Sequence, residues 1–335
     1  MTIPGAEWLS SSTIDPLILL LAALAAEALL GEARGPLARL PHPVRLIGAL
    51  IDLCDRKLND RSCSARTRRW RGVLTVVLVM AAAAAAGGVI VLISRALPFG
   101  CIIEVTAVVS LLAQRSLYRH VRAVAVALGG SLEAGRAAVS HIVGRDVARL
   151  DRAGVARAAI ESCAENFSDA VVAPVFWYVL LGLPGLCVYK AVNTLDSMIG
   201  HRSLKYLAFG MPSARLDDAL NLIPARLAGL YVVIAAAADP RTDARRAWRT
   251  MRNDAKKHRS PNAGWPEASM AGALGLALAG PRQYPMVTVD DPWLGDGSAA
   301  ADVPDIWRAL DLFRLACVVN ALVIAVLVVI RLSLS

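Results

Sequence analysis

The sequence predicts an all-α protein, a polytopic bundle of membrane helices with a polar active-site region of helices and loops on the cytoplasmic side. Three observations support this prediction. Of the 335 residues, 56% are hydrophobic and only 19% are charged, and the mean hydropathy is +0.51, well above that of a soluble enzyme. Two apolar blocks, residues 72–94 and 170–189, contain no charge. Each reaches the roughly 20 residues that a helix needs to cross a hydrocarbon core about 30 Å thick.

The apolar blocks predict the membrane spans. We expect four spans, at residues 16–31, 72–94, 96–113 and 315–330. The segments that begin near residues 170, 219 and 268 could instead be re-entrant or buried against the bundle. In the first of these, Pro174 and Pro184 would kink or break a spanning helix. Few ionisable side chains lie inside apolar blocks, namely Glu27, Glu104 and Arg226.

The distribution of basic residues predicts the orientation. Ten Lys and Arg side chains but only three acidic ones lie between residues 34 and 71, so the loop 32–71 is expected in the cytoplasm by the positive-inside rule. We expect the chain to form membrane-embedded helices over 1–113, a cytoplasm-facing catalytic region over 114–312 and a last transmembrane helix over 313–335. This places the protein in the inner membrane, with its active site facing the cytoplasm. Because the net charge of +9 mostly reflects topology, we expect no nucleic-acid partner.

Common cofactor signatures are missing from the sequence. The six cysteines include no Cys-x-x-Cys pair, and neither a Gly-x-x-x-x-Gly-Lys-Ser/Thr loop nor a Gly-x-Gly-x-x-Gly turn occurs. Zinc fingers and the two commonest nucleotide-binding loops are therefore not indicated. Any ATP site must be built from other residues.

The stretch ESCAENFSD contains three carboxylates in helical register. Glu161, Glu165 and Asp169 stand at positions i, i+4 and i+8, which places them on one face of a helix. Like charges stacked in this way destabilise a bare helix. A cation relieves this repulsion, and Mg²⁺ held by carboxylates and substrate phosphates is the usual arrangement where phosphoryl groups are handled. The alternative interpretation is a solvated acidic face.

The stretch YKAVNTLDSM places Lys190, Asn193 and Asp196 close together after an apolar block. Lysine offers a point charge for a phosphate, whereas Asn and Asp offer oxygen ligands for a hard cation. A polar interfacial turn and a lysine that extends to the membrane surface are the alternatives. Similar mixtures of cations and carboxylates occur at Arg145, at Lys205 and in SARLDD with Arg215 and Asp217. A helix end capped near Gly144 and ordinary surface ion pairs are the alternatives there.

Two further stretches offer flat or amide-bearing side chains. HRSPNAGWPEASM contains Asn262, Trp265 and Glu267 before a small-residue helix too short to cross a membrane. Its Pro and Gly residues predict a turn, and Trp265 offers a flat surface to a large ring system. DDPWLGD adds Trp293, although this loop could equally be a turn without chemistry.

Taken together and in this order, the strings PHPVRLIG, IVGRD, ENFSD, YKAVNTLDSMIG, SARLDD, SPNAGWPEA and the Pro-Trp-x-Gly-Asp loop resemble the adenosylcobinamide-phosphate synthase family of cobalamin biosynthesis. The resemblance runs from about residue 41 to residue 296. It implies an inner-membrane enzyme that joins the carboxylate of adenosylcobyric acid to the amine of an aminopropanol phosphate and consumes ATP. One departure is the Gly-Asp-Pro stretch that usually precedes His-Pro-Val, since Gly31, Glu32 and Ala33 stand there.

The residue types agree with this chemistry, because activating a carboxylate with ATP requires phosphoryl charge to be neutralised and an amine to be positioned. We expect Mg²⁺ as the cofactor and ATP as a co-substrate. The catalytic candidates are Glu165, Lys190 and Asp196. The candidates for phosphate and nucleotide binding are Arg145, Lys190, Asn193, Lys205 and Arg215. The candidates for substrate binding are His42, Asn262, Trp265, Glu267 and Trp293. The candidate metal ligands are Glu161, Glu165, Asp169 and Asp217.

Two other classes of function stay open from the sequence. A membrane scaffold or sensor could share the fold without catalysis. A transporter would carry ionisable groups along a path inside its spans, but the dense polar clusters lie between the apolar blocks. The expected partners are the corrinoid substrate, the amino-alcohol phosphate and the lipid bilayer, with a homo-oligomer and other cobalamin-pathway enzymes as further candidates.

Overall fold

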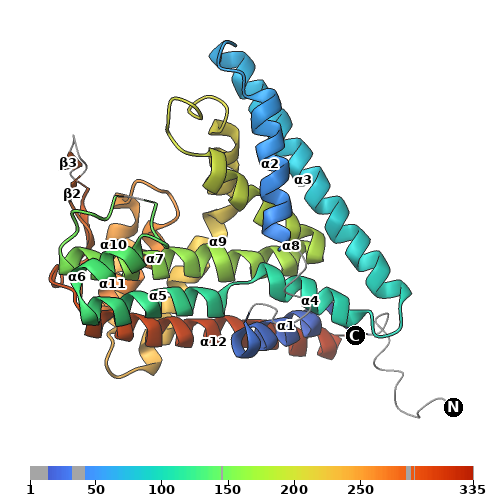
Figure 1. Cartoon of the computed structure of the whole chain (residues 1–335). Helices are drawn as coiled ribbons and strands as arrows, with labels where there is room; N and C mark the ends of the chain where they lie inside the picture. The colour runs from blue at the N-terminus through green and yellow to red at the C-terminus, as the bar shows by residue number, and fades with distance from the viewer. Residues whose placement is uncertain (1–13, 32–41, 145, 284–287, 290, 335) are drawn as a thin grey trace. The chain divides into compact units, whose positions relative to one another are not determined.

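The computed structural model describes residues 14–31, 42–144, 146–283, 288–289 and 291–334. Its elements are almost all helices (Figure 1), which confirms the predicted all-α fold. The chain forms two compact units. The first comprises residues 1–113, 173–220 and 324–335, and the second comprises residues 114–172 and 221–323. Each unit is described separately below.

Five helical segments of the described chain are long and apolar enough to cross a membrane. They are Ala65–Ala96, Cys101–Gly130, Arg152–Ile199, Met211–Ala238 and Val303–Leu334. The protein is therefore an integral membrane protein, but two expected spans are wrong in detail. The helix over 16–31 has only 15 residues, and the one expected over 96–113 is the 11-residue helix Cys101–Leu111, which reaches spanning length only with the helix after it. Two of the five segments lie inside 114–312, so the cytoplasmic placement of that region stays a prediction.

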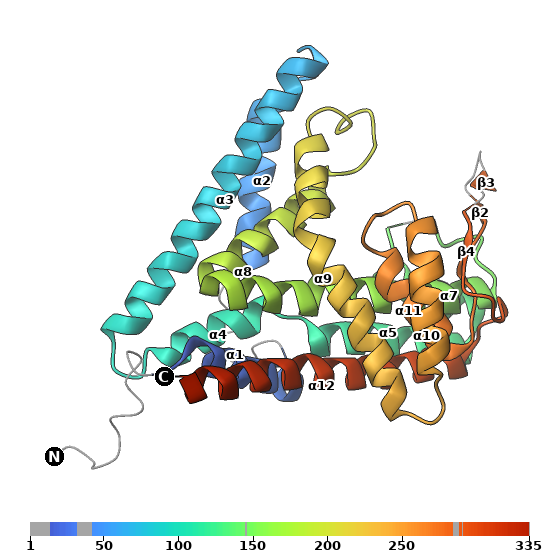
Figure 2. The same cartoon turned by 180° about the vertical axis from the view of Figure 1, so that it is seen from behind.

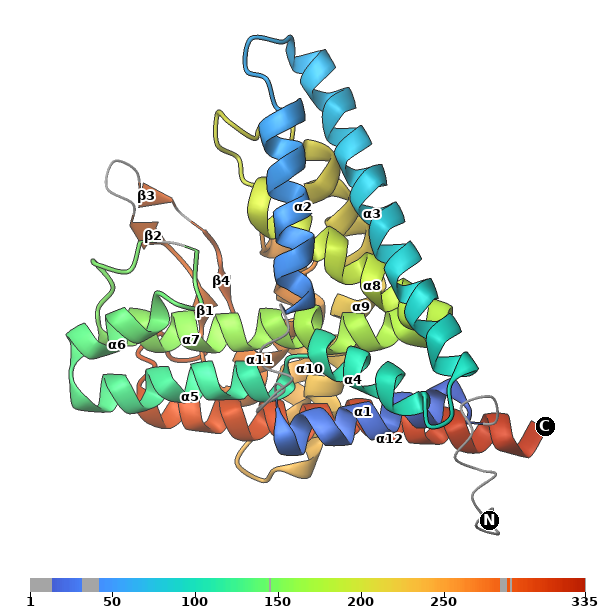
Figure 3. The same ribbon diagram turned by 45° about the vertical axis from the view of Figure 1, so that its right-hand side comes forward.

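The first unit contains α1 (Pro16–Leu30), α2 (Pro43–Leu58), α3 (Ala65–Ala96), α4 (Cys101–Leu111) and α8 (Ala173–Ile199). α2 starts at the sequence His-Pro, where His42 Nδ1 accepts a hydrogen bond from the Val44 amide and Pro43 needs no partner for its nitrogen. α2 and α3 run side by side and are joined by a short turn, as Figures 1 and 3 both show. Ser64 caps α3 by accepting a hydrogen bond from Thr67 N.

A kink in α8 allows α3 to pack closely against it. Gly182 has φ 64°, a conformation that favours glycine, and Pro184 follows inside the helix. A Cβ atom on Gly87 of α3 would lie 2.8 Å from Pro184 Cα. The two helices can therefore approach at this point only because residue 87 has no side chain. The kink expected from Pro184 is confirmed, whereas Pro174 lies at the start of α8, where proline is tolerated.

A loop over residues 200–210 connects α8 to α9 (Met211–Ala238). Its two ends meet, because a side chain on Gly210 would overlap the carbonyl of Ile199. The end of the loop also touches α3, where a side chain on Gly72 would overlap the carbonyl of Phe209. A surface loop of this length with closed ends is an Ω-loop.

Proline interrupts the backbone hydrogen bonds of α9 as well. Pro224 lies inside the helix and has no N–H to donate to the carbonyl of Leu220, four residues earlier. The indole nitrogen of Trp177 on α8 donates to that carbonyl instead, at 3.2 Å. The freed acceptor is thereby satisfied, as a backbone group in an apolar environment must be.

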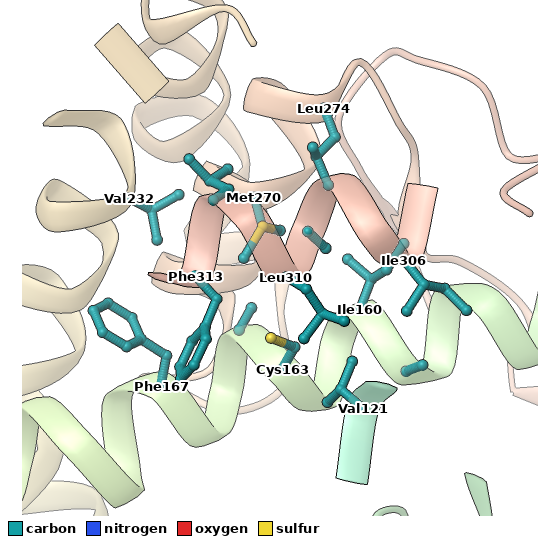
Figure 4. Close-up of a cluster of buried hydrophobic side chains, with 14 of the residues drawn as sticks. Val121, Ile160, Cys163, Phe167, Val232, Met270, Leu274, Ile306, Leu310 and Phe313 are labelled. Atoms are coloured by element: carbon teal, nitrogen blue, oxygen red, sulfur yellow. The ribbon is translucent and has the colours of Figure 1, made fainter. Parts of the chain in front are cut away.

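The second unit packs α5 (Gln114–Gly130), α6 (Leu132–Val139), α7 (Arg152–Phe167), the later part of α9, α10 (Ala244–Asp254), α11 (Gly264–Leu274) and the first part of α12 (Val303–Leu334) around one apolar core. α10 and α11 lie side by side (Figure 2). In the core, Phe167 of α7 meets Phe313 of α12 edge to face, with ring centroids 5.7 Å apart (Figure 4). Two short antiparallel ladders, β1 (Leu278–Ala279) with β4 (Trp293–Leu294) and β2 (Arg282–Gln283) with β3 (Thr288–Val289), follow α11 (Figure 3).

Candidate active site

A polar cluster occupies the last three turns of α8 in the first unit. The helix continues to Ile199, so Lys190, Asn193 and Asp196 lie inside it and not in the polar turn considered from the sequence. All three side chains are half-buried. Asn193 Nδ2 donates to Asp217 Oδ1 of α9 at 3.4 Å. The structure thus brings predicted phosphate-binding, catalytic and metal-binding candidates from two helices into one cluster.

The Asp196 carboxylate is surrounded by further charged groups. It lies near enough to Asp218 and His201 for their charges to act on it, and Arg202 acts in the same way on Asp218. A side chain on Gly200 would overlap Asp196 Oδ1, so glycine keeps this space open for the carboxylate. Sequence reasoning did not assign a role to His201 or Arg202, although both stand within six residues of Asp196.

Lys205 lies in the Ω-loop and is already engaged. Its ammonium donates to Asp55 Oδ2 at 2.6 Å and to the Tyr206 hydroxyl at 2.7 Å, and the Tyr206 hydroxyl donates to the same Asp55 oxygen at 3.2 Å. Burial of Asp55 favours its neutral form, but hydrogen bonds from Lys205 and Asn59 outweigh this effect and lower its pKa. These contacts give Lys205 a part in fastening the loop, and its phosphate-binding role stays a prediction.

The end of α2 and the start of α3 complete the attachment of this loop. Asn59 Nδ2 donates to Asp55 Oδ1 at 2.8 Å, and Arg68 Nη2 donates to Asn59 Oδ1 at 2.9 Å. Arg68 also donates to the Lys205 carbonyl. From the sequence, Asp55 and Arg68 are predicted only to be charges of the loop over 32–71. The sequence signal is an Asp and an Asn four residues apart at a helix end, a pattern too common to assign a role.

The three carboxylates predicted to share one helical face in the second unit differ in their surroundings. Glu161 is buried and its Oε1 accepts a hydrogen bond from Ala279 N at 2.9 Å, whereas Glu165 is exposed. α7 ends at Phe167, and Asp169 lies in a π-helical segment, Ser168–Val172. Glu161 and Glu165 stand four residues apart in α7, so they keep the predicted spacing on one face of the helix. The acidic face and the metal-binding role of the three residues stay predictions.

The donor set in the first unit has the chemistry that Mg²⁺ requires. Asn193, Asp196, Asp217 and Asp218 all offer oxygen ligands at the junction of α8 and α9. Within the described ranges, no three His, Cys, Asp or Glu side chains are grouped as a protein-only metal site. Mg²⁺ is usually held by one or two carboxylates together with substrate phosphates, and the α8–α9 carboxylates fit that arrangement.

In the second unit, residues 261–263 form a turn before the 11-residue α11, as predicted, and Gly264, Trp265 and Pro266 begin that helix. Ser260 Oγ accepts hydrogen bonds from the amides of Asn262 and Ala263. Ser260 N donates to His258 Nδ1 at 3.0 Å, which leaves Nε2 as the protonated ring nitrogen of a neutral His258. Nε2 lies 3.8 Å from Oε2 of the buried Glu267. Asn262 is also buried, whereas Trp265 is half-buried.

Trp293 lies in β4 of the same unit and is partly exposed, with the Arg157 guanidinium 5.5 Å from its ring centroid. The following loop is held by Asp296, which pairs with Arg246 at 2.7 Å. Hydrogen bonds from Arg246 lower the pKa of this carboxyl. Trp293 therefore belongs to a short strand, and not to the plain turn considered from the sequence.

The remaining predicted residues take separate positions. Arg215 is exposed on the first turns of α9, in the same unit as Lys190. His42 caps α2 and is half-buried. Arg145 and Glu32 lie outside the described residues. The first unit therefore holds the candidates His42, Lys190, Asn193, Asp196, Lys205, Arg215 and Asp217, and the second holds Glu161, Glu165, Asp169, Asn262, Trp265, Glu267 and Trp293.

Comparison with known proteins gives a consistent result. A family model described as "CobD/Cbib protein" matches residues 20–313. The "Cobalamin biosynthesis protein CobD" of Brucella suis is 49% identical over 301 residues, which cover 89% of this chain and 92% of that protein. The protein of the same name from Sinorhizobium fredii is 48% identical over 321 residues, covering 94% and 98%. That from Rhodobacter capsulatus is 47% identical over 292 residues, covering 87% and 90%. No solved structure matches the chain.

Proposed function

The chain belongs to the CobD/Cbib family of cobalamin biosynthesis proteins, and on this premise we propose that it is an ATP- and Mg²⁺-dependent ligase that forms adenosylcobinamide phosphate. The carboxylate of adenosylcobyric acid is activated by ATP, and the amine of aminopropanol phosphate attacks the activated acyl group. The activating group leaves, the nitrogen loses its proton, and an amide bond results.

The observation that supports this proposal most directly is the polar cluster at the junction of α8 and α9. Lys190, Asn193 and Asp196 of α8 lie in the same unit as Asp217 and Asp218 of α9, and the Asn193–Asp217 hydrogen bond joins the two helices. A ligase of this kind must bind phosphoryl groups, ligate a hard cation and accept a proton from an amine. Lysine, amide and carboxylate side chains supply these three capacities.

Each residue of the cluster has a proposed role. Lys190 neutralises phosphoryl charge, and Asp196 accepts the proton of the attacking ammonium or ligates the metal. Asn193 and Asp217 contribute oxygen ligands. Bound Mg²⁺ would supply charge neutralisation at the phosphates of ATP. In the second unit, Glu165 is proposed as a metal ligand, and Asn262, Trp265, Glu267 and Trp293 as contacts for the corrinoid.

The proposal includes a location in the inner membrane with the active site facing the cytoplasm, where ATP is present. The basic turn between α2 and α3 supports this orientation, because Arg56, Lys57, Arg61, Arg66 and Arg69 are all exposed there.

The decisive experiment uses purified protein in detergent with adenosylcobyric acid, aminopropanol phosphate, ATP and Mg²⁺. Mass spectrometry of the product should show one amide bond formed for each ATP consumed, and chromatography of the nucleotides identifies ADP or AMP. Omission of ATP or Mg²⁺ should abolish the product. Protein that is folded and binds both substrates but forms no amide would support a scaffold or sensor instead. Movement of either substrate across proteoliposomes without amide formation would support a transporter.

A further inference from the structure

Arg226 is a cation inside one of the five apolar helical segments. It lies 15 residues after Met211 and 12 residues before Ala238 in α9, which is about 22 Å and 18 Å from the helix ends at 1.5 Å per residue. A charge so far from either end is costly in an apolar segment, and such residues usually serve a substrate or ion. Arg226 is exposed, and no described carboxylate lies within ion-pair distance of it.

The guanidinium is instead held by an aromatic face. Its Cζ lies 4.5 Å from the ring centroid of Trp265, the shortest cation–π distance among the described residues. Trp265 is fixed in turn, because its Nε1 donates to the Pro261 carbonyl at 3.2 Å. Both residues belong to the second unit. Trp265 therefore orients Arg226 without neutralising its charge.

A glycine one turn further along α9 permits this contact. A Cβ atom on Gly229 would lie 3.0 Å from the Trp265 carbonyl and 2.9 Å from Met251 Sδ. Ala225 and Ala228 on the same part of the helix are fully buried. The small residues let α11 approach α9 closely enough for Trp265 to lie against Arg226.

The stacked arrangement leaves the edge of the guanidinium available. An arginine carries five N–H donors in one plane, and Arg226 makes one hydrogen bond among the described residues, from Nη1 to the Leu222 carbonyl. Stacking uses the face of the group and not its N–H edge. A carboxylate or phosphate accepts two parallel hydrogen bonds from such an edge.

We propose that Arg226, oriented by Trp265, binds the anionic group of a substrate, either the carboxylate of the corrinoid acid or the phosphate of the amino alcohol. The inference rests on the proposed function and adds to it a recognition site that the sequence motifs do not contain. The carboxylate and the phosphate offer the same chemistry to Arg226. Each is an oxyanion that would neutralise the positive charge of the guanidinium inside the apolar helix.

The test measures equilibrium binding to purified full-length protein in detergent with two matched pairs of compounds. One pair is adenosylcobyric acid and its primary amide, and the other is aminopropanol phosphate and aminopropanol, so only the first compound of each pair carries the anionic group. Arg226→Gln should weaken binding of one compound with the anionic group at least tenfold and change binding of its counterpart without that group less than twofold. The compound whose binding is weakened carries the anionic group that Arg226 binds. Arg252→Gln is the matched control, because Arg252 lies over Trp248 at 5.8 Å on α10, and it should change neither pair.

Arg226→Lys keeps the charge but loses the planar edge, so it should show a smaller loss and remains informative if Arg226→Gln does not fold. If wild-type protein binds the two compounds with an anionic group and both Arg226 variants bind them equally well, the inference is wrong while the proposed function stands. If wild-type protein binds neither of these two compounds, the proposed function fails and the inference fails with it.

Discussion

The ammonium of Lys205 donates a 2.6 Å hydrogen bond to the carboxylate of Asp55, a residue 150 positions earlier in the chain. Through this bond, the Ω-loop over 200–210 is attached to the last turn of α2. The loop starts four residues after Asp196 and ends seven residues before Asp217. Attachment of the loop therefore restrains the chain between Asp196 and Asp217, two carboxylates of the candidate active site in the first unit.

Replacing Lys205 should release this loop. Lys205→Met removes the ammonium, and we expect hydrogen exchange of the amides over 201–209 to rise about fivefold, as suits an ion pair worth about 1 kcal/mol at a half-exposed position. Lys57→Met is the matched control, since Lys57 is exposed in the last turn of the same helix, and it should leave the exchange unchanged. Equal exchange in all three proteins would show that other contacts hold the loop.

The same ion pair predicts a pH range for loop protection. The folded-state pKa of Asp55 is lowered from 3.8, so its contribution is complete above about pH 4 and is lost as the pH falls through the lowered value. The pKa of Lys205 is raised from 10.5, so its contribution is complete below that pH and is lost as the pH rises through the raised value. Loop protection, corrected for intrinsic exchange, should therefore be constant between about pH 5 and pH 9.

Gly200→Ala should displace the Asp196 carboxylate, because an added Cβ overlaps its Oδ1 atom. We expect turnover in the amide-forming assay to fall at least about tenfold, or roughly 1.4 kcal/mol in the barrier, with normal protein levels. Gly88→Ala is the control, since nothing lies within 4 Å of a Cβ there. Full activity of the Gly200 variant would remove Asp196 from the catalytic candidates.

Lys190→Arg separates phosphate binding from extension to the membrane surface. Lys190 lies nine residues before the end of α8, between the buried Tyr189 and Ala191, so the membrane-surface reading requires a long reach. A compact ammonium fitted to one phosphate tolerates the broader guanidinium poorly. Turnover should fall at least about tenfold, roughly 1.4 kcal/mol. Wild-type turnover would leave phosphate binding to Arg145, Lys205 and Arg215.

Glu165→Gln should raise the Mg²⁺ concentration that gives half-maximal activity, because it deletes one charge from a proposed ligand while keeping its size. Glu161→Ala provides the contrast. It removes the acceptor of the Ala279 amide in the core, so it should lower the free energy of unfolding by about 1–3 kcal/mol, seen as a lower melting temperature in detergent. An unchanged Mg²⁺ titration for Glu165→Gln would exclude it as a ligand.

A cysteine at Ser203 tests the orientation, since this residue is exposed in the Ω-loop. In a background without the six native cysteines, we expect an impermeant maleimide to label it only in inside-out vesicles. Labelling in intact cells would place the loop, and the α8–α9 cluster beside it, on the outer side.

The sequence predicted the helical class well but not the extent of each helix. α8 continues past Lys190 because Ala191, Val192, Leu195 and Ile199 are all buried on one side of it, while the polar residues between them lower the local hydropathy without breaking the helix. Conversely, the helix expected over 96–113 begins only at Cys101 and ends at Leu111. Apolar length predicts that a helix exists more securely than where it ends.

For the candidate site too, the sequence predicted some features and not others. The motifs placed Asn193 and Asp217 among the site residues, and the structure joins them directly. The pairing of Lys205 with Asp55 could not be foreseen, because no local pattern says which distant carboxylate a lysine will meet. Buried Glu161 accepts a hydrogen bond from the Ala279 amide, 118 residues away in the chain, and helical spacing carries no information about that contact.

The indole of Trp177 and the ring of Pro224 are linked through a third group, the Leu220 carbonyl, that belongs to neither. The proline creates an unsatisfied acceptor and the tryptophan satisfies it, so neither residue alone explains the other's presence. Their effects on folding are therefore coupled: the indole N–H matters only while position 224 cannot donate. The effects of changing the two positions on the free energy of unfolding are therefore expected to be non-additive.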